Sequence, residues 1–140
     1  MADQNVALRI IVENPPVRFA VQRGKDELLE PISASVERQV FEFSVRARDD
    51  GSGGEPNFLG PFALGPVGGR FVYVNSGTMG GEPNSQWTRR AKVPLGGLTW
   101  RLIRKAAGSV IEARISGTAR DGGPACATVP LLGGGWKIAQ

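Results

Sequence analysis

Apolar and polar residues alternate with a period of two along several stretches of this chain, and this pattern constrains its fold more than any other feature. In VFEFSVRAR, residues 40–48, the apolar Phe41, Phe43, Val45 and Ala47 alternate with charged or hydroxyl-bearing residues. Successive side chains of a β-strand point to opposite faces of the sheet. The segment therefore predicts a strand with one buried face and one hydrated face.

The same period recurs in ALRIIVE, VRFAVQR and IEARIS, which begin at residues 7, 17 and 111. RFVYVN, from residue 70, is apolar at consecutive positions, which predicts a central strand or one covered on both faces. The chain also holds 20 glycines and 10 prolines, more than helices accept in their interiors. We therefore expect a mainly antiparallel barrel or sandwich of about eight short strands, in a single β-rich domain over residues 1–140. The longest irregular segments are expected at 24–36 and 49–60.

One short helix is predicted near residues 98–107. Gly96 and Gly97 end the strand before it, Thr99 is suited to cap its N-terminus, and Gly108 ends it. An apolar stripe at helical spacing supports the helix: Leu98, Leu102, Ile103, Ala106 and Ala107. The cations Arg101, Arg104 and Lys105 then face water.

Charge is distributed unevenly along the chain. Residues 1–69 hold 7 Lys/Arg and 10 Asp/Glu, a net charge of −3, whereas residues 70–140 hold 10 and 3, a net charge of +7. The excess of cations in the second half fits a surface for an anionic partner. We prefer the interpretation that acidic strands of the first half pair with basic strands of the second, because cross-strand charge pairs are common on sheet surfaces.

Several classes of site are excluded by what the chain lacks. It has no histidine, so it cannot form a Ser-His-Asp triad, a Cys-His pair or an imidazole metal site. It contains neither G-x-G-x-x-G nor G-x-x-x-x-G-K-[ST], the signatures of dinucleotide and P-loop sites. We therefore expect no metal and no cofactor. With one cysteine, no signal-peptide pattern and no run of 18 apolar residues, the chain is expected to be cytoplasmic and without a membrane partner.

The strand SQWTRRAKVPL, residues 85–95, supplies most of the candidate binding residues. Alternation places Trp87 and Arg89 on its apolar side, and Arg90 and Lys92 on the other. A guanidinium directed toward a core needs an anion to offset its desolvation. We favour an internal ion pair of Arg89 with Glu42 or Glu13 over contact with a ligand. A one-residue bulge would exchange Arg89 for Arg90.

The glycine-rich stretch GPFALGPVGGRFVYVNSG, residues 60–77, raises a second candidate. Its Gly-Pro pairs are sufficient to turn a corner between strands. Its glycines would also let an anion or a planar ligand approach the main chain beside Arg70, with Tyr73 or Asn75 supplying a hydrogen bond. No catalytic residue is predicted. The candidate ligand-binding residues are Arg70, Tyr73, Asn75, Trp87, Arg89, Arg90 and Lys92.

Several of these segments together resemble a family of small bacterial proteins known only as a domain of unknown function. The resemblance is carried by VRFAVQRG from residue 17, FLGPFALGPVGGRFVYVNSG from 58, WTRRAKVPL from 87 and ARISGTARDGGPACATVPLLGGGW from 113. Members of that family often have M-F-R-R-A-K around the paired arginines and a tryptophan near position 75 or 76. Here Trp87 and Thr88 precede the arginines, and Asn75 and Ser76 replace the tryptophan. The resemblance implies a bacterial, cytoplasmic protein and no particular activity.

Three classes of function remain open. We favour a binding module for a small anionic or amphipathic molecule, whose acidic group is anchored by Arg70 or Arg89. Aromatic residues would line its cavity: Phe19, Phe43, Phe71, Tyr73 and Trp87. The first alternative is single-stranded nucleic-acid binding through the basic second half. The second is a metal-free enzyme that uses carboxylate, tyrosine or lysine chemistry, although no two carboxylates have a telling spacing. Edge strands also leave homodimerisation open.

Overall fold

A computed structural model describes residues 3–15, 19–23, 27–48, 57–59, 72–76, 89–93, 95, 97–117, 127–128 and 130–139 of the chain. These residues form eleven β-strands and one short α-helix. The strands are arranged in two sheets, most of whose neighbouring strands are antiparallel. The mainly antiparallel β fold with one short helix is thus confirmed.

The first sheet is built around two long strands, β1 (Asp3–Glu13) and β5 (Arg38–Arg48), which pair antiparallel over their full length. Its order is β11-β9-β1-β5-β4, and β6 also pairs with β5. β9 lies parallel to β1, although more than 90 residues separate them in the chain. The shorter strands of this sheet are β4 (Ser33–Ala34), β6 (Asn57–Leu59), β9 (Ile111–Ser116) and β11 (Leu132–Ile138).

The second sheet has the order β10-β8-β7-β2-β3. Its strands are β2 (Phe19–Arg23), β3 (Glu27–Leu29), β7 (Val72–Ser76), β8 (Arg89–Val93) and β10 (Ala127–Thr128). β7 is the central strand, as its two-sided apolar sequence predicted. β10 is parallel to β8, and the other pairs are antiparallel.

The expectation of a barrel or sandwich of about eight short strands needs correction in two respects. Among the described strands, neither sheet closes on itself, so a barrel is not shown. The three additional strands, β3, β4 and β6, lie in the segments 24–36 and 49–60 that were expected to be irregular. Each has two or three residues, too few for a period-two pattern to be recognised.

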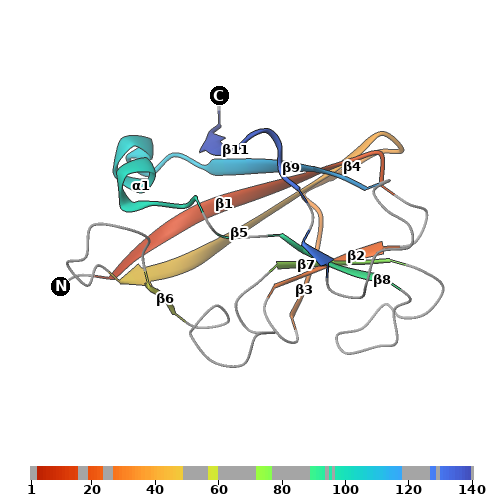
Figure 1. The fold of residues 1–140 in the computed structure, drawn as a ribbon, viewed down its shortest axis with the longest axis horizontal. Helices are drawn as coiled ribbons and strands as arrows, with labels where there is room; N and C mark the ends of the chain where they lie inside the picture. Colours follow the sequence, from red (N-terminus) through yellow and green to blue (C-terminus); the bar gives the residue numbers. More distant parts are fainter. Residues whose placement is uncertain are drawn as a thin grey trace.

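The hydrophobic core is shared by the two sheets, which lie one above the other in Figure 1. The first sheet contributes alternate residues of β1, β5 and β9, as the period-two patterns predicted. The second sheet contributes Val21, Val74 and Val93. Ile11 is an exception to the alternation, because it lies on the face of β1 that points away from the core and is nevertheless only 6% exposed.

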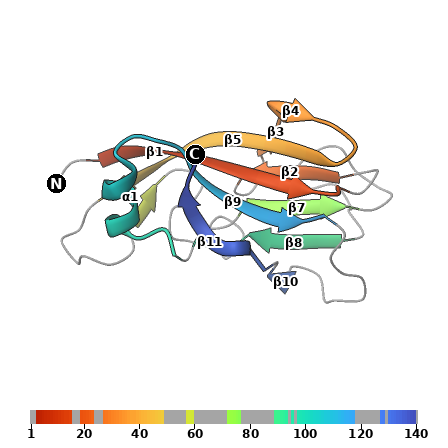
Figure 2. The same cartoon turned by 90° about the horizontal axis from the view of Figure 1, so that it is seen from above.

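The helix α1 (Trp100–Ala106) lies near the N-terminal end of β1 in Figures 1 and 2. Thr99 caps it by accepting a hydrogen bond from the backbone N–H of Leu102, 3.2 Å away, as predicted. Trp100, which the predicted stripe omitted, is buried with Ile103 and Ala106.

The end of the helix also departs from the predicted apolar stripe. Ala107 is exposed because it forms the left-handed C-cap, with φ of 53°. The predicted exposure of Arg101, Arg104 and Lys105 is confirmed. The guanidinium of Arg104 lies 5.8 Å from the centroid of the Trp100 ring, within the range of a cation–π contact.

The chain crosses between the sheets at both of their edges. β3, an edge of the second sheet, is followed after three residues by β4, an edge of the first. On the opposite side, β10 is followed after three residues by β11 in the same way. Among the described strands, β3 is thus linked to β4 and β10 to β11 by short connections, which join the two sheets at two of their edges.

Candidate functional site

Five of the seven predicted site residues lie in β7 and β8, adjacent strands of the second sheet. Tyr73 and Asn75 belong to β7, and Arg89, Arg90 and Lys92 belong to β8. In the antiparallel register, Tyr73 is opposite Lys92 and Asn75 is opposite Arg90. Residues directly opposite in such a pair lie about 4.5–5.5 Å apart at their Cβ positions. The sheet thus brings together residues that are separated by 15 or more positions in the chain.

The register also assigns these positions to the two faces of the sheet. Val74 and Val93 are buried in the core, and alternate residues of a strand share a face. The positions next to these valines therefore lie on the face directed away from the core. We call the four of them the β7–β8 group: Tyr73, Asn75, Arg90 and Lys92. Gln22 of β2 and Thr128 of β10 extend the row of Tyr73 and Lys92 across four strands.

Arg89 occupies a position on the core's side of β8, opposite Ser76 of β7. The β7–β8 register runs without a bulge over the described residues, so the alternative in which a bulge exchanges Arg89 for Arg90 is not found there. Phe19 is also opposite Ser76, on the other edge of β7. Phe19 and Tyr73 therefore occupy positions on opposite faces of the second sheet.

Two of the predicted site residues, Arg70 and Trp87, lie outside the described residues, as does most of the glycine-rich stretch 60–77. The carboxylates expected to pair with Arg89 have other cationic partners. Glu42 contacts Arg9 and Glu13 contacts Arg38, on the face of the first sheet that points away from the core. We call this face the outer face of the first sheet.

One group of charged side chains on the outer face consists of an arginine between two carboxylates. Arg9 donates from Nε to Glu42 Oε2 at 2.7 Å and from Nη1 to Glu112 Oε1 at 3.2 Å. The hydrogen bond to Glu42 is the largest cause of a raised pKa of the Arg9 guanidinium, and burial opposes it. We call this group, which joins β5, β1 and β9, the Arg9 cluster.

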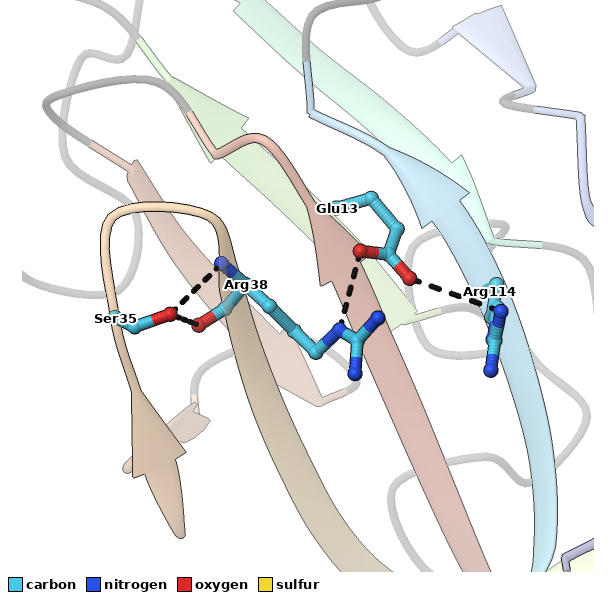
Figure 3. A network of polar contacts seen from close by, with 4 residues as sticks. All are labelled: Glu13, Ser35, Arg38 and Arg114. Atoms are coloured by element: carbon cyan, nitrogen blue, oxygen red, sulfur yellow. Dashed lines mark hydrogen bonds and ion pairs between the residues drawn. The ribbon is translucent and has the colours of Figure 1, made fainter.

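A second group, the Glu13 cluster, has the opposite composition: one carboxylate lies between two arginines (Figure 3). Arg38 Nε donates to Glu13 Oε1 at 3.1 Å. Arg114 Nη1 lies 3.9 Å from Glu13 Oε2, an ion pair that is too long for a hydrogen bond. The Nε atom of Arg114 is buried without a hydrogen-bond partner. This cluster therefore has a net charge of +1 and an incompletely satisfied guanidinium.

Sequence reasoning missed both clusters, although a signal for them exists. Arg9 and Glu13 are four residues apart on β1, and Arg38 and Glu42 are four residues apart on β5. Antiparallel pairing of two strands with the same order of charges brings each arginine opposite a glutamate. To predict the two clusters from this signal, one would also need to know that β1 and β5 are neighbours in the sheet. These two pairs join charges within the first half of the chain, so they do not bear out the preferred interpretation of the uneven charge distribution. The pair of Arg114 with Glu13 does join a cation of the second half to a carboxylate of the first.

Within the part of the chain that the structure describes, no three Asp, Glu, Cys or His side chains cluster in a way that could hold a metal ion. In the same residues, no helix has the length and apolar character needed to cross a bilayer.

Comparison with known proteins assigns the chain to a family. Residues 6–139 match the family described as "Family of unknown function (DUF5990)", so the chain belongs to it and the predicted resemblance is confirmed. No curated protein and no solved structure matches the chain.

Proposed function

We propose that this member of the family is a β-sandwich that binds a small anionic or amphipathic molecule at the β7–β8 group. The observation that carries the proposal is the register that sets Tyr73 opposite Lys92 and Asn75 opposite Arg90. This register supports the proposal because, in each of the two pairs, a cation of β8 lies opposite a hydrogen-bonding residue of β7. A carboxylate or phosphate group is recognised by such a combination of charge and hydrogen-bond donors.

The spacing of the four positions supports a ligand of modest size. Alternate residues along a strand are about 7 Å apart, and opposite positions are about 5 Å apart. The β7–β8 group therefore spans an area that suits an anionic group with an attached ring or short chain. Arg90 and Lys92 would bind the anion, and Tyr73 and Asn75 would orient it.

Native mass spectrometry of the gently purified protein tests this proposal. We expect a mass excess that disappears on denaturation, or saturable binding of an anionic compound from a panel of carboxylates and phosphates. The double variant Arg90→Gln/Lys92→Gln should lose that binding. Arg46→Gln, which removes a cation from the first sheet, is the matched control and should retain it. A bare mass together with no binding from the panel would reject the proposal.

Single-stranded nucleic acid is a second candidate ligand, favoured by the exposed cations of α1. Arg101, Arg104 and Lys105 are all exposed there and add to the positive charge of β8. Binding to phosphates weakens as salt concentration rises. Fluorescence anisotropy with a labelled oligothymidine strand measures this directly. Salt-dependent binding that is reduced by Arg101→Gln/Lys105→Gln supports this candidate, and unchanged anisotropy at low salt contradicts it.

A further inference from the structure

The Glu13 cluster differs from an ordinary surface ion pair in having more hydrogen-bond donors than acceptors. A guanidinium carries five N–H donors and prefers a carboxylate that accepts two of them in parallel. Arg114 makes neither contact, because its nearest carboxylate oxygen is 3.9 Å away and its Nε has no partner. The side chains of Arg38 and Arg114 are 51% and 43% exposed. Both side chains are therefore partly accessible to solvent, although the Nε atom of Arg114 is buried.

Exposed apolar side chains lie on both sides of this cluster. Among the described residues, the large exposed hydrophobic side chains are Ile32, Val36 and Leu132. Leu132 of β11 is opposite Arg114 in the register. Val36 is two residues before Arg38 and is 91% exposed. Arginine is enriched at protein–protein interfaces, whose buried centres are apolar.

The turn that carries Val36 is held in place by several hydrogen bonds. The backbone N–H of Ser35 donates to Arg38 O at 2.8 Å. The Ser35 hydroxyl also donates to Arg38 O at 3.2 Å and accepts from the backbone N–H of Arg38 at 3.2 Å (Figure 3). Asn14 N–H also donates to Glu37 O at 2.8 Å, which ties the turn to the end of β1. A side chain presented on such a fixed turn loses little conformational freedom on binding.

We propose that the Glu13 cluster, with Val36 and Leu132, is a docking surface for an acidic segment of a partner protein. A carboxylate of that segment binds Arg114 and Arg38, and the apolar residues beside it contact Val36 and Leu132. Charge complementarity selects this partner, because the cluster has a net charge of +1 and the ion pair of Arg114 with Glu13 is 3.9 Å long, too long for a hydrogen bond.

Glu13 has a defined part in this interaction, because its carboxylate competes with that of the partner for the same two guanidiniums. It also holds Arg38 in place through the hydrogen bond to Nε. Replacing it with glutamine removes the competing charge while keeping an oxygen acceptor. Loss of the ion pairs of Glu13 should therefore strengthen binding of the acidic segment.

The test uses synthetic peptides and the full chain. The probe is an acetylated and amidated heptapeptide that alternates leucine with glutamate. Its two controls replace glutamate with glutamine, or leucine with serine. Nuclear magnetic resonance titration follows the backbone amides of β1, β5 and β9 and the Nε–H groups of the arginines. We expect saturable shifts around Glu13 and Arg114 with the leucine–glutamate peptide, and affinity at least about tenfold weaker for either control, as loss of one charged hydrogen bond or a buried side chain implies.

Variants of the protein decide whether the named residues carry the binding. Arg114→Gln should weaken binding of the leucine–glutamate peptide about tenfold, and Val36→Ser several-fold, whereas Glu13→Gln should strengthen it several-fold. Arg46→Gln, on the outer face of the same sheet, is the matched control and should leave the affinity within about twofold. Unchanged amide spectra away from the cluster show that each variant is folded.

Three results would overturn the inference. The first is the absence of saturable shifts with the leucine–glutamate peptide. The second is an equal loss of affinity in Arg114→Gln and Arg46→Gln, which would show unspecific attraction to positive charge. The third is binding of inorganic phosphate at Arg114 as tightly as the peptide, which would identify a small-anion site in place of a protein docking surface.

Discussion

The Arg9 cluster and the Glu13 cluster lie on the same three strands of the first sheet, yet their charges are arranged in opposite ways. In the Arg9 cluster, one arginine donates to two carboxylates at 2.7 and 3.2 Å. In the Glu13 cluster, one carboxylate contacts two arginines, one of them at 3.9 Å. An arginine has enough donors for two carboxylates, whereas one carboxylate shared by two arginines leaves donors unsatisfied. The first arrangement stabilises the sheet, and the second leaves a guanidinium available to a partner.

The contacts of Arg9 in the Arg9 cluster raise the pKa of its guanidinium. The main cause is the hydrogen bond to Glu42. Because the folded-state pKa lies above the unfolded value, the stabilisation is present at every pH below the ordinary range of arginine. It is lost only as pH rises through the raised pKa, at strongly alkaline pH. Around neutral pH, the Arg9 cluster is therefore a constant contribution to the stability of the fold.

The largest effect is expected at Ile11, which lies between the two clusters along β1. Ile11→Ala should lower the free energy of unfolding by about 2–4 kcal/mol, because it removes a side chain that is buried although it lies on the outer face. Urea denaturation measures this value. Ala7→Gly, at another position on the outer face of β1, controls for the change in backbone propensity. A loss below about 0.5 kcal/mol, the range of ordinary surface substitutions, would show that the clusters do not cover Ile11.

The next largest effect is expected for Arg9→Gln, which leaves Glu42 and Glu112 without their shared cation. The partly buried carboxylates then repel each other, and we expect a loss of about 1–3 kcal/mol, between the values for exposed and buried ion pairs. The loss should be the same at about pH 7 and pH 9, since arginine stays charged at both. Arg46→Gln serves as the control. Equal losses in the two variants would remove the distinction between the Arg9 cluster and the rest of the face.

Double-mutant cycles compare the coupling within the two clusters directly. For Arg9 and Glu42 we expect a coupling energy of about 1 kcal/mol, whereas for Arg114 and Glu13 we expect a few tenths of a kcal/mol, since a long exposed ion pair contributes little. Both couplings are measured by thermal or urea denaturation of the single and double glutamine variants. A coupling for Arg114 and Glu13 as large as that for Arg9 and Glu42 would contradict the comparison.

The smallest effect is expected for Arg114→Gln alone. Arg114 makes no short hydrogen bond to Glu13 and its Nε has no partner, so its removal should change the free energy of unfolding by less than about 0.5 kcal/mol. Because this change in the free energy of unfolding is small, a loss of peptide binding in the same variant reports on binding and not on folding. A loss above about 1 kcal/mol would assign Arg114 a structural role.

The sequence predicted the features of this fold that depend on local patterns. The alternation of Phe41, Phe43 and Val45 placed β5 and its buried face correctly, and Thr99 and Gly108 marked the limits of α1. The alternation on β8 also placed Arg89 and Arg90 on opposite faces.

Features of the fold that depend on strand order could not be predicted from the sequence. Ile11 is at an outward position in the period-two pattern of β1, and that pattern alone does not predict its burial. Glu13 and Arg114 come together because β9 lies parallel to β1, a pairing of distant segments that no local pattern specifies. The residues of the β7–β8 group were named one by one from the sequence, but only the register shows that the positions of Tyr73 and Asn75 share a face with those of Arg90 and Lys92.

The parallel pairing of β1 with β9 also bears on how the chain reaches its fold during synthesis. Leu8 and Ile111 are partners in this pairing, so a ribosome must add about a hundred residues after β1 before its second neighbour exists. β5 is made earlier and covers only one edge of β1. Folding dominated by such distant pairings is slow, and an unpaired edge invites association with other chains. The nascent chain therefore passes through a period in which the central strand of its first sheet is open on one side, and molecular chaperones are most useful to it then.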